Sequence, residues 1–279
     1  MADIDLGKYG VWRHYGGFTP ESAAEIERLG YGTLWLGGSP GNELEMVEPL
    51  LQATTTLKVA TGIVNIWSTS AKAIAESVHR IDAKYPGRFL LGVGVGHPEA
   101  TAEYRSPYQA LVDYLDELDQ HGVPADRRVL AALGPKVLTL STARGAGAHP
   151  YLTTPEHTRE AREILGTEAI LAPEQKVVLD DHADAARAIG RKTVDNPYLH
   201  LKNYVNNLKR LGFTDADIAD GGSDRLIDAL ALHGSAAQIA AGLRAHIDAG
   251  ADHVAIQVLP PKDSPIPTLS ALAEVLFPH

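Results

Sequence analysis

The chain has 279 residues, of which 44% are hydrophobic and 22% charged, the composition of an ordinary globular protein. Its formal charge of −10 excludes the basic surface of a general nucleic-acid-binding protein, and the absence of cysteine excludes disulfides and thiolate chemistry. There is no run of about 18 apolar residues, and the first residues lack the basic and apolar regions of a signal peptide. We therefore expect a cytoplasmic protein that acts on a small-molecule substrate and has no nucleic-acid or membrane partner.

Short apolar runs alternate with helical runs along the chain. The apolar runs are rich in Val, Ile, Leu and Gly, as is typical of strands buried on both faces. Two helices are expected to begin with a capping threonine, a proline and an acid, at Thr19 and at Thr154. The predicted strands are 7–12, 33–36, 58–66, 88–95, 129–133, 146–152 (a strand or a strand-like loop), 177–179 and 253–259. The predicted helices are 20–29, a short one capped by Ser39 or Asn42 that ends at Ala53, 70–84, 107–121, 135–143, 155–165, 183–211 with an interruption at Asn196-Pro197, 223–232, 236–249 and 269–276.

Strands that alternate with helices about eight times predict an α/β fold, a (β/α)8 TIM barrel, as one domain over residues 1–279. No linker or low-complexity tract divides the chain. A doubly wound sheet would need a glycine-rich turn that opens a helix after the first strand, and WRHYGGF at 12–18 is a poor match to such a turn.

In a barrel, catalytic side chains lie at the carboxyl ends of the strands. His97 follows the glycine-rich GVGVG, and we expect it either to hold a cofactor or substrate or to cap the next helix. His14 is a candidate proton donor, with an exposed loop histidine as the alternative. Ser39 is the polar side chain nearest the end of the second strand, and a weak candidate.

The stretch 145–151, GAGAHPY, runs toward the start of a helix at Thr154. Free backbone N–H groups and the positive end of the helix dipole would suit a phosphate there. This is a route by which an acidic protein binds an anionic ligand. The alternative is a tight loop whose glycines have only a conformational role.

Three motifs together resemble the luciferase-like flavin and deazaflavin oxidoreductases: TGIV at 61–64, YPGRFLLGVGVGH at 85–97 and GAHPYLTTPEHTREAREILG at 147–166. The resemblance covers nearly the whole chain and looks closest to actinobacterial hydride transferases that use coenzyme F420. It implies a luciferase-like barrel, F420 as cofactor, hydride transfer between C5 of the deazaflavin and an organic substrate, and a homodimer.

The resemblance also implies a cofactor site. Gly62-Ile63 matches a non-prolyl cis peptide that supports the cofactor ring from behind. Related F420 enzymes often carry Glu at the position of His97, and many carry a histidine after the second strand, where this chain has GGSPGN. This second departure argues against a sugar-phosphate dehydrogenase mechanism. The implied cofactor-binding residues are Gly62, Ile63, Val64, Asn65, Gly96, His97, Gly147, Ala148, His149, Pro150 and Tyr151.

Three other functions stay open. An FMN-dependent monooxygenase on the same fold would need reduced FMN from a partner. A non-catalytic barrel could keep the flavin-type pocket for binding alone. An aldolase would want a lysine at a strand end, where the sequence shows none. The twelve histidines contain no HExxH and no closely spaced pair, so no metal site is predicted.

Overall fold

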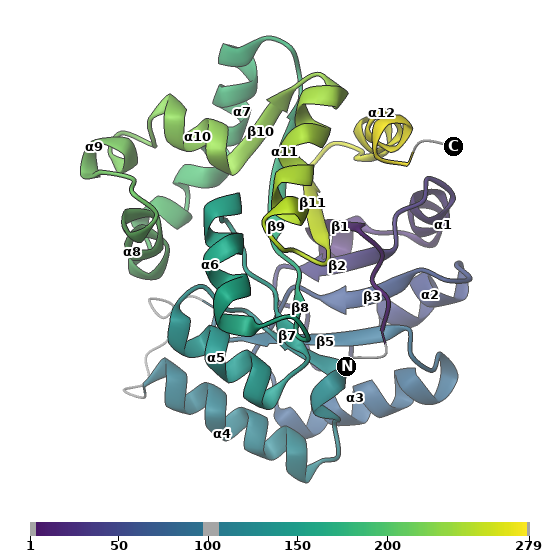
Figure 1. The fold of residues 1–279 in the computed structure, drawn as a ribbon. Helices are drawn as coiled ribbons and strands as arrows, with labels where there is room; N and C mark the ends of the chain where they lie inside the picture. Colours follow the sequence, from purple (N-terminus) through teal and green to yellow (C-terminus); the bar gives the residue numbers. More distant parts are fainter. Residues whose placement is uncertain (1–3, 97–105, 278–279) are drawn as a thin grey trace.

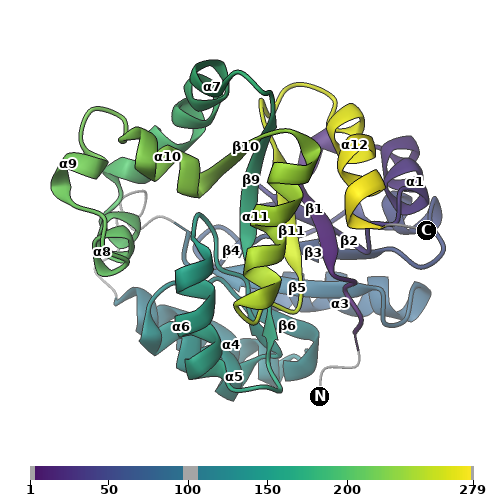
Figure 2. The ribbon, with the colours of Figure 1, turned by 45° about the horizontal axis from the view of Figure 1, so that its top comes forward.

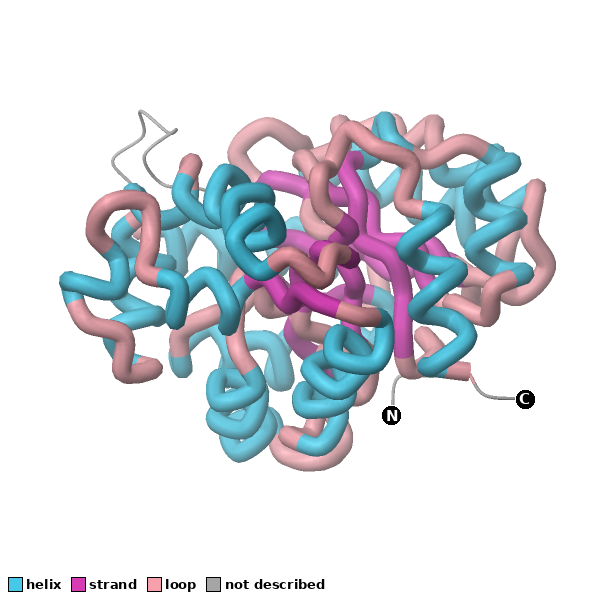
Figure 3. Tube along the Cα trace, turned by 90° about the horizontal axis from the view of Figure 1, so that it is seen from above, coloured by secondary structure: helices cyan, strands magenta, loops and turns pink. Residues whose placement is uncertain are grey.

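The computed structural model describes residues 4–96 and 106–277. Parallel strands form a curved sheet in the middle of the molecule, with helices around it (Figures 1 and 3). From β1 outward on one side, the order is β1 (Tyr9–His14), β2 (Thr33–Gly37), β3 (Lys58–Thr61), β5 (Phe89–Gly94), β6 (Arg128–Leu130), β7 (Gly147–Ala148) and β8 (Ile170–Leu171). On the other side of β1 lie β11 (Val254–Val258), β9 (Glu174–Leu179) and β10 (Ala231–Gly234).

The barrel closes where β8 continues into β9. Only Ala172 and Pro173 separate these two strands. The Glu174 N–H donates to the Pro150 carbonyl (2.8 Å), and the Ala255 N–H donates to the Pro173 carbonyl (2.9 Å). The bent segment β8–β9 therefore joins the β7 side of the sheet to β11. Counting it as one strand, and leaving out β10, which pairs only with β9, gives the eight positions of a (β/α)8 barrel and confirms the predicted fold class.

The carboxyl-terminal strands differ most from the sequence prediction. The strand predicted at 177–179 begins at Glu174. Its first three residues are polar, so the apolar pattern did not reveal them as part of the strand. The helix predicted over 223–232 ends at Leu230, and the next residues form β10, which pairs with the edge of β9. This pairing satisfies backbone groups that β9 would otherwise leave exposed at its edge.

Two amino-terminal strands also differ from the prediction. β1 extends to His14, so His14 is the last residue of the strand and does not follow it. The strand predicted at 58–66 is interrupted by a cis peptide between Gly62 and Ile63, as the resemblance implied. After the interruption, β4 (Val64–Asn65) pairs with β5.

Twelve helices lie within the described residues. They are α1 (Pro20–Arg28), α2 (Val47–Gln52), α3 (Ala71–Lys84), α4 (Pro107–Gln120), α5 (Pro135–Arg144), α6 (Pro155–Leu165), α7 (Ala183–Asp195), α8 (Lys202–Arg210), α9 (Asp215–Ile218), α10 (Asp224–Leu230), α11 (Ala236–Asp248) and α12 (Ile266–Leu276). The 3-10 helices η1 (Tyr15–Gly17), η3 (Ala125–Arg127) and η4 (Tyr198–His200) connect them. No helix in this part of the chain combines the length and apolarity needed to cross a bilayer.

Of the two threonine caps expected from the sequence, Thr19 caps α1, whereas Thr154 makes no side-chain capping bond at the start of α6. Thr19 and Ser22 form a reciprocal capping box at α1, as the Thr-Pro-Glu motif predicts. The short helix predicted after Ser39 begins only at Val47 and has no side-chain cap. The Asn42 carboxamide instead accepts from the Ser70 N–H (2.8 Å) and connects this loop to the start of α3.

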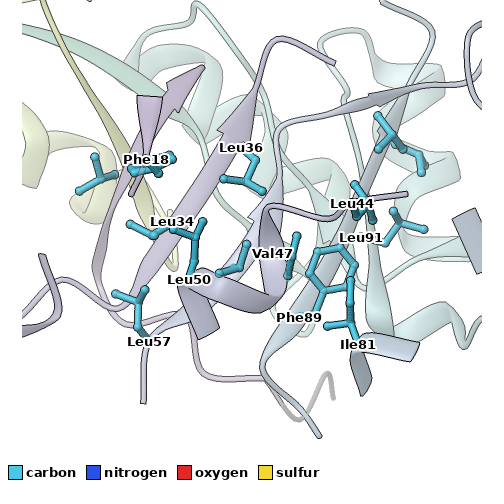
Figure 4. Close-up of a cluster of buried hydrophobic side chains, with 14 of the residues drawn as sticks. Phe18, Leu34, Leu36, Leu44, Val47, Leu50, Leu57, Ile81, Phe89 and Leu91 are labelled. Atoms are coloured by element: carbon cyan, nitrogen blue, oxygen red, sulfur yellow. The ribbon is translucent and has the colours of Figure 1, made fainter. Parts of the chain in front are cut away.

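The largest apolar cluster lies between the strands and helices α1 to α4, α11 and α12, and Figure 4 shows part of it. Leu34 and Leu36 of β2 pack toward α2, and Ile81 of α3 packs near Phe89 of β5. A second cluster joins α7, η4, α8 and α10, which stand together beside the barrel in Figure 2. Truncating one fully buried leucine or isoleucine to alanine in such a core costs about 2–5 kcal/mol.

Candidate functional site

A cavity of about 610 Å³ lies at the carboxyl ends of the strands. Its lining follows β1, β2, β3, β5, β6 and β7 in turn, and η4 and α8 form the remaining wall. This is the end of a barrel where binding sites are expected. A cavity of this size suits a small molecule or a cofactor.

The structure brings together seven of the residues that the sequence analysis named. Those that line the cavity are His14, Ser39, Gly62, Ile63, Gly96, His149 and Tyr151. Those that lie beside the lining but do not contribute to it are Val64, Asn65, Gly147, Ala148 and Pro150. His97 lies outside the described residues.

Two amides inside the stretch 145–151 are already bonded to the neighbouring strand and are not free, contrary to the expectation. The Ala146 N–H donates to the Arg128 carbonyl, and the His149 N–H donates to the Leu130 carbonyl. A Cβ atom built at Gly147 would lie 2.0 Å from the Ile170 carbonyl oxygen. These residues are held in the ladder between β6 and β8, so this glycine allows close strand packing and does not form a loop around a phosphate.

The helix N-terminus at the cavity is that of α5, which the sequence analysis did not single out. Gly134 is the N-cap residue and provides no side-chain cap, and Leu133, Gly134 and Val137 line the cavity. A Cβ atom built at Gly134 would meet nothing within 4 Å. Open space at an uncapped helix start favours an anion. The Gly-Pro dipeptide directly after a strand, without a capping side chain, was the sequence signal for this site.

Arg210 of α8 adds positive charge to the same end of the cavity. It donates to the Leu133 carbonyl (3.1 Å) and to the Asn207 carboxamide oxygen. Among the described residues that line the cavity, it is the only lysine or arginine. The Asn207 carboxamide nitrogen is buried and has no hydrogen-bond partner within residues 4–96 and 106–277. We call Gly134 and Arg210 the anion end of the cavity.

Four aromatic residues, Trp12, Tyr151, Tyr198 and Tyr204, form what we call the aromatic wall. Successive ring centroids lie 5.1, 5.3 and 5.1 Å apart. The Tyr198 hydroxyl donates to the Tyr151 hydroxyl (3.1 Å), which donates to the Gln257 carboxamide oxygen (2.9 Å). Burial raises the pKa of Tyr198 to about 12 and raises the pKa of Tyr151 and Tyr204 well above their ordinary value. The wall is therefore uncharged at neutral pH.

The His149 side chain is held as one tautomer of the neutral ring. Its ring stacks on Trp35 at 4.0 Å, and its Nδ1 lies 2.7 Å from the Ala172 carbonyl. Because a carbonyl only accepts, Nδ1 carries the proton and Nε2 carries a lone pair. Burial lowers the pKa of His149 to about 4, so the ring stays neutral near pH 7.

His14 and Ser39 lie at the exposed side of the cavity. The His14 Nδ1 accepts from the Gly16 N–H (3.2 Å), so the proton of a neutral ring is on Nε2. The backbone of Gly38 lies so close to this ring that a Cβ atom built there would be 2.7 Å from Nε2. Ser39 has a left-handed backbone with φ of 56°, an uncommon conformation for a residue other than glycine.

A buried ion pair in the barrel interior was missed from the sequence. Lys176 and Glu174 of β9 are 0% and 1% exposed, and the lysine Nζ is 3.1 Å from both carboxylate oxygens. Burial acts on both groups, lowering the pKa of Lys176 and raising that of Glu174. Lys176 lies within β9 and is paired and covered, unlike the strand-end lysine that an aldolase needs.

Comparisons with known proteins agree with this architecture. The chain is similar to an F420-dependent secondary alcohol dehydrogenase in complex with an F420–acetone adduct (15% identity, TM-score 0.73, covering 97% of this chain and 98% of that one). It is also similar to the F420-dependent tetrahydromethanopterin reductase of Methanopyrus kandleri (14%, 0.72, 99% and 99%). A third similar structure is the FMN complex of the oxygenating constituent of 3,6-diketocamphane monooxygenase from Pseudomonas putida (13%, 0.69, 97% and 97%).

These similarities show that the chain has the α/β-barrel fold of these proteins. No curated protein matches the sequence. The family model described as luciferase-like monooxygenase matches residues 7–121. This match confirms the resemblance to luciferase-like proteins that the sequence motifs indicated, over residues 7–121.

Proposed function

We propose that this protein is an F420-dependent oxidoreductase that transfers a hydride between C5 of the deazaflavin and a small organic substrate. The observation that carries the proposal is the combination of two environments in one cavity. Apolar side chains, among them Ile63, Val95 and Ala131, line the part beside the strand ends, and the anion end lies at α5. This combination suits a cofactor with an apolar ring system and a phosphate.

The residues present fit such a group. Ile63, Val95 and Ala131 would bury the rings, and the start of α5 with Arg210 would hold the phosphate. When bound, a deazaflavin supplies or accepts the hydride. His14 holds a proton on Nε2 at the exposed side and is the proposed proton donor or acceptor for the substrate. Two of the similar structures are named as F420-dependent enzymes, which supports the choice of cofactor.

The first test is a titration of the purified protein with F420 and, separately, with FMN, followed by fluorescence quenching. Tight F420 binding with weak FMN binding is the expected result. The reverse order would replace the proposal with an FMN-dependent monooxygenase. Binding of neither cofactor would overturn both functions.

A second titration tests the anion end. Arg210→Met should weaken F420 binding about tenfold or more, since a charge-assisted hydrogen bond contributes about 1.5–3 kcal/mol. The same substitution should have little effect on the phosphate-free deazaflavin core. The matched control is Lys209→Met, because Lys209 has the same charge on the same helix and also pairs with an acid, Asp215 (2.5 Å) against Glu160 for Arg210 (3.7 Å), but does not line the cavity. Equal losses for both ligands would exclude a phosphate at Arg210.

The FMN alternative has one observation in its favour. The anion end would accept the phosphate of FMN as well as that of F420, and one similar structure contains FMN. A non-catalytic binding barrel is the remaining alternative. Turnover of F420 with enones or alcohols separates it from the enzyme, and His14→Asn should then reduce turnover with unchanged F420 affinity.

A further inference from the structure

Lys176 and Glu174 form a fully buried ion pair two residues apart on β9. Taking two charges out of water is expensive, and a well-packed apolar pair of similar volume is often as stable or more stable. Stability alone therefore does not account for this pair. Its other contacts indicate its role.

Both partners contact the residues around Tyr151. The Lys176 Nζ lies 4.0 Å from the Tyr151 ring centroid and 5.5 Å from that of Tyr198. The Glu174 carboxylate accepts from the Leu152 N–H (3.2 Å), and the Glu174 N–H donates to the Pro150 carbonyl (2.8 Å). The pair thus contacts the ring of Tyr151 and the backbone on either side of it.

Leu152 makes this anchoring specific. Its φ is 56°, in the left-handed region that a leucine rarely adopts. Such a conformation persists only when surrounding contacts hold it. The carboxylate of Glu174 provides one of these contacts, directly after the aromatic residue that lines the cavity.

We propose that Glu174 and Lys176 are positioning residues that hold Tyr151, and through it the aromatic wall, in the orientation that the cavity ligand requires. The ammonium group fixes one face of the Tyr151 ring, and the carboxylate fixes the following backbone. The proposal rests on the proposed function only in its second experiment, which measures the affinity for F420.

The first experiment needs no ligand. The protein is labelled with 3-fluorotyrosine, and the Tyr151 signal in the ¹⁹F NMR spectrum is assigned with Tyr151→Phe. The double variant Glu174→Gln/Lys176→Met removes both charges, leaves no unpaired charge and keeps an oxygen for the Leu152 N–H. We expect the Tyr151 signal to shift and broaden. An unchanged signal in the folded double variant would overturn the proposal.

The control is Arg187→Gln/Asp228→Asn. This ion pair (2.8 Å) joins α7 to α10, whereas the described contacts of the Tyr151 side chain are with Trp12, Lys176, Tyr198 and Gln257. It should leave the Tyr151 signal unchanged. If the double variant at β9 does not fold, the ¹⁹F NMR signal of Tyr151 in the wild type tests the proposal instead. Fast flipping of the Tyr151 ring would contradict a held ring, and slow exchange would support one.

The second experiment measures F420 affinity by fluorescence. The Glu174→Gln/Lys176→Met pair should raise the Kd about three- to tenfold, the range expected for a desolvated cation–π contact. In a Tyr151→Leu background the same pair should cause no further loss, because its effect passes through that ring. Wild-type affinity in the double variant, or an undiminished effect without Tyr151, would overturn the positioning role. If the wild type binds neither F420 nor FMN, the proposed function fails, and the NMR experiment alone decides the positioning role.

Discussion

The two parts of the barrel on either side of residue 121 bury different kinds of polar side chain. In the described residues up to 121, every buried polar side chain is a hydroxyl. They are Thr33, Thr54, Thr61, Thr69 and Ser77. Beyond residue 121, the buried polar side chains include charged groups, imidazoles and carboxamides. They are Arg128, His149, His157, Glu174, Gln175, Lys176, Asn207, His246, His253 and Gln257, together with the hydroxyls Ser141, Thr153, Thr154 and Thr158.

The difference shows how each part satisfies its buried groups. A hydroxyl can bond to backbone nearby, as when Thr61 donates to the Gly92 carbonyl and accepts from the Gly92 N–H (both 2.8 Å). The buried groups beyond residue 121 bond to side chains as well as to backbone, as when His246 bonds to Gln175 (2.9 Å) and the His149 Nδ1 donates to the Ala172 carbonyl (2.7 Å). The luciferase-like family model ends at the same boundary. The amino-terminal part is a conventional apolar scaffold, and the carboxyl-terminal part holds the three tyrosines of the aromatic wall on a polar interior.

The largest effect should come from acid, and it should act on the carboxyl-terminal part. Burial lowers the pKa of His149, His157, His246 and His253 to about 4, from an ordinary 6.5. Below pH 6.5 the unfolded chain binds protons that the folded chain does not. The free energy of unfolding should therefore fall as the pH falls from about 6.5 toward 4, by up to about 1.4 kcal/mol per pH unit for each histidine.

Urea unfolding at pH 7, 6 and 5 checks this expectation. His246→Gln should reduce the slope of unfolding free energy against pH by the contribution of one histidine, up to about 1.4 kcal/mol per pH unit. Hydrogen exchange at pH 5 should lose protection first beyond residue 121. Equal stability at pH 7 and pH 5 would show that the two parts do not differ in this way.

Breaking the buried ion pair on one side should be the next largest effect. Lys176→Met leaves the Glu174 carboxylate buried without a counter-charge and should cost about 3–5 kcal/mol of unfolding free energy. Glu174→Gln/Lys176→Met should recover most of this loss. Denaturant unfolding of the two variants measures the difference, and a loss that persists in the double variant would contradict the electrostatic explanation.

A buried hydroxyl in the amino-terminal part should matter less. Thr61→Val keeps the shape of the side chain but removes the bonds to the Gly92 carbonyl and N–H. We expect a loss of about 1–3 kcal/mol, the cost of leaving a buried group unpaired, and no dependence on pH between 7 and 5. A loss of unfolding free energy as large as that of Lys176→Met would contradict the difference between an interior with buried hydroxyls and one with buried charges.

The smallest effects should be equal in both parts. Thr19 caps α1 and Ser235 caps α11, each in a reciprocal capping box. Thr19→Ala and Ser235→Ala should each cost about 1 kcal/mol. Since both caps are at the surface, urea unfolding should give similar losses, and a large difference would mean that the two parts differ beyond their interiors.

Sequence reasoning predicted the fold well and part of the site. Apolar runs such as that of β5 and caps such as Thr19 are local signals, so their elements appear where expected. The rule for barrel strand ends correctly placed His14, Ser39 and Tyr151 at one cavity. It could not show that Gly147 is packed inside the sheet, because that depends on its neighbour Ile170.

The sequence by itself determined the alternation of strands and helices, the motifs that resemble luciferase-like proteins and the starts of several helices, because each depends on residues close together in the chain. Only the tertiary structure decided that β8 and β9 close the barrel, that the start of α5 and Arg210 share one end of the cavity, and that Lys176 lies behind Tyr151. These arrangements join residues that are far apart in sequence. A polar run such as Glu174–Lys176 looks like surface until the fold surrounds it with partners that offset the loss of water.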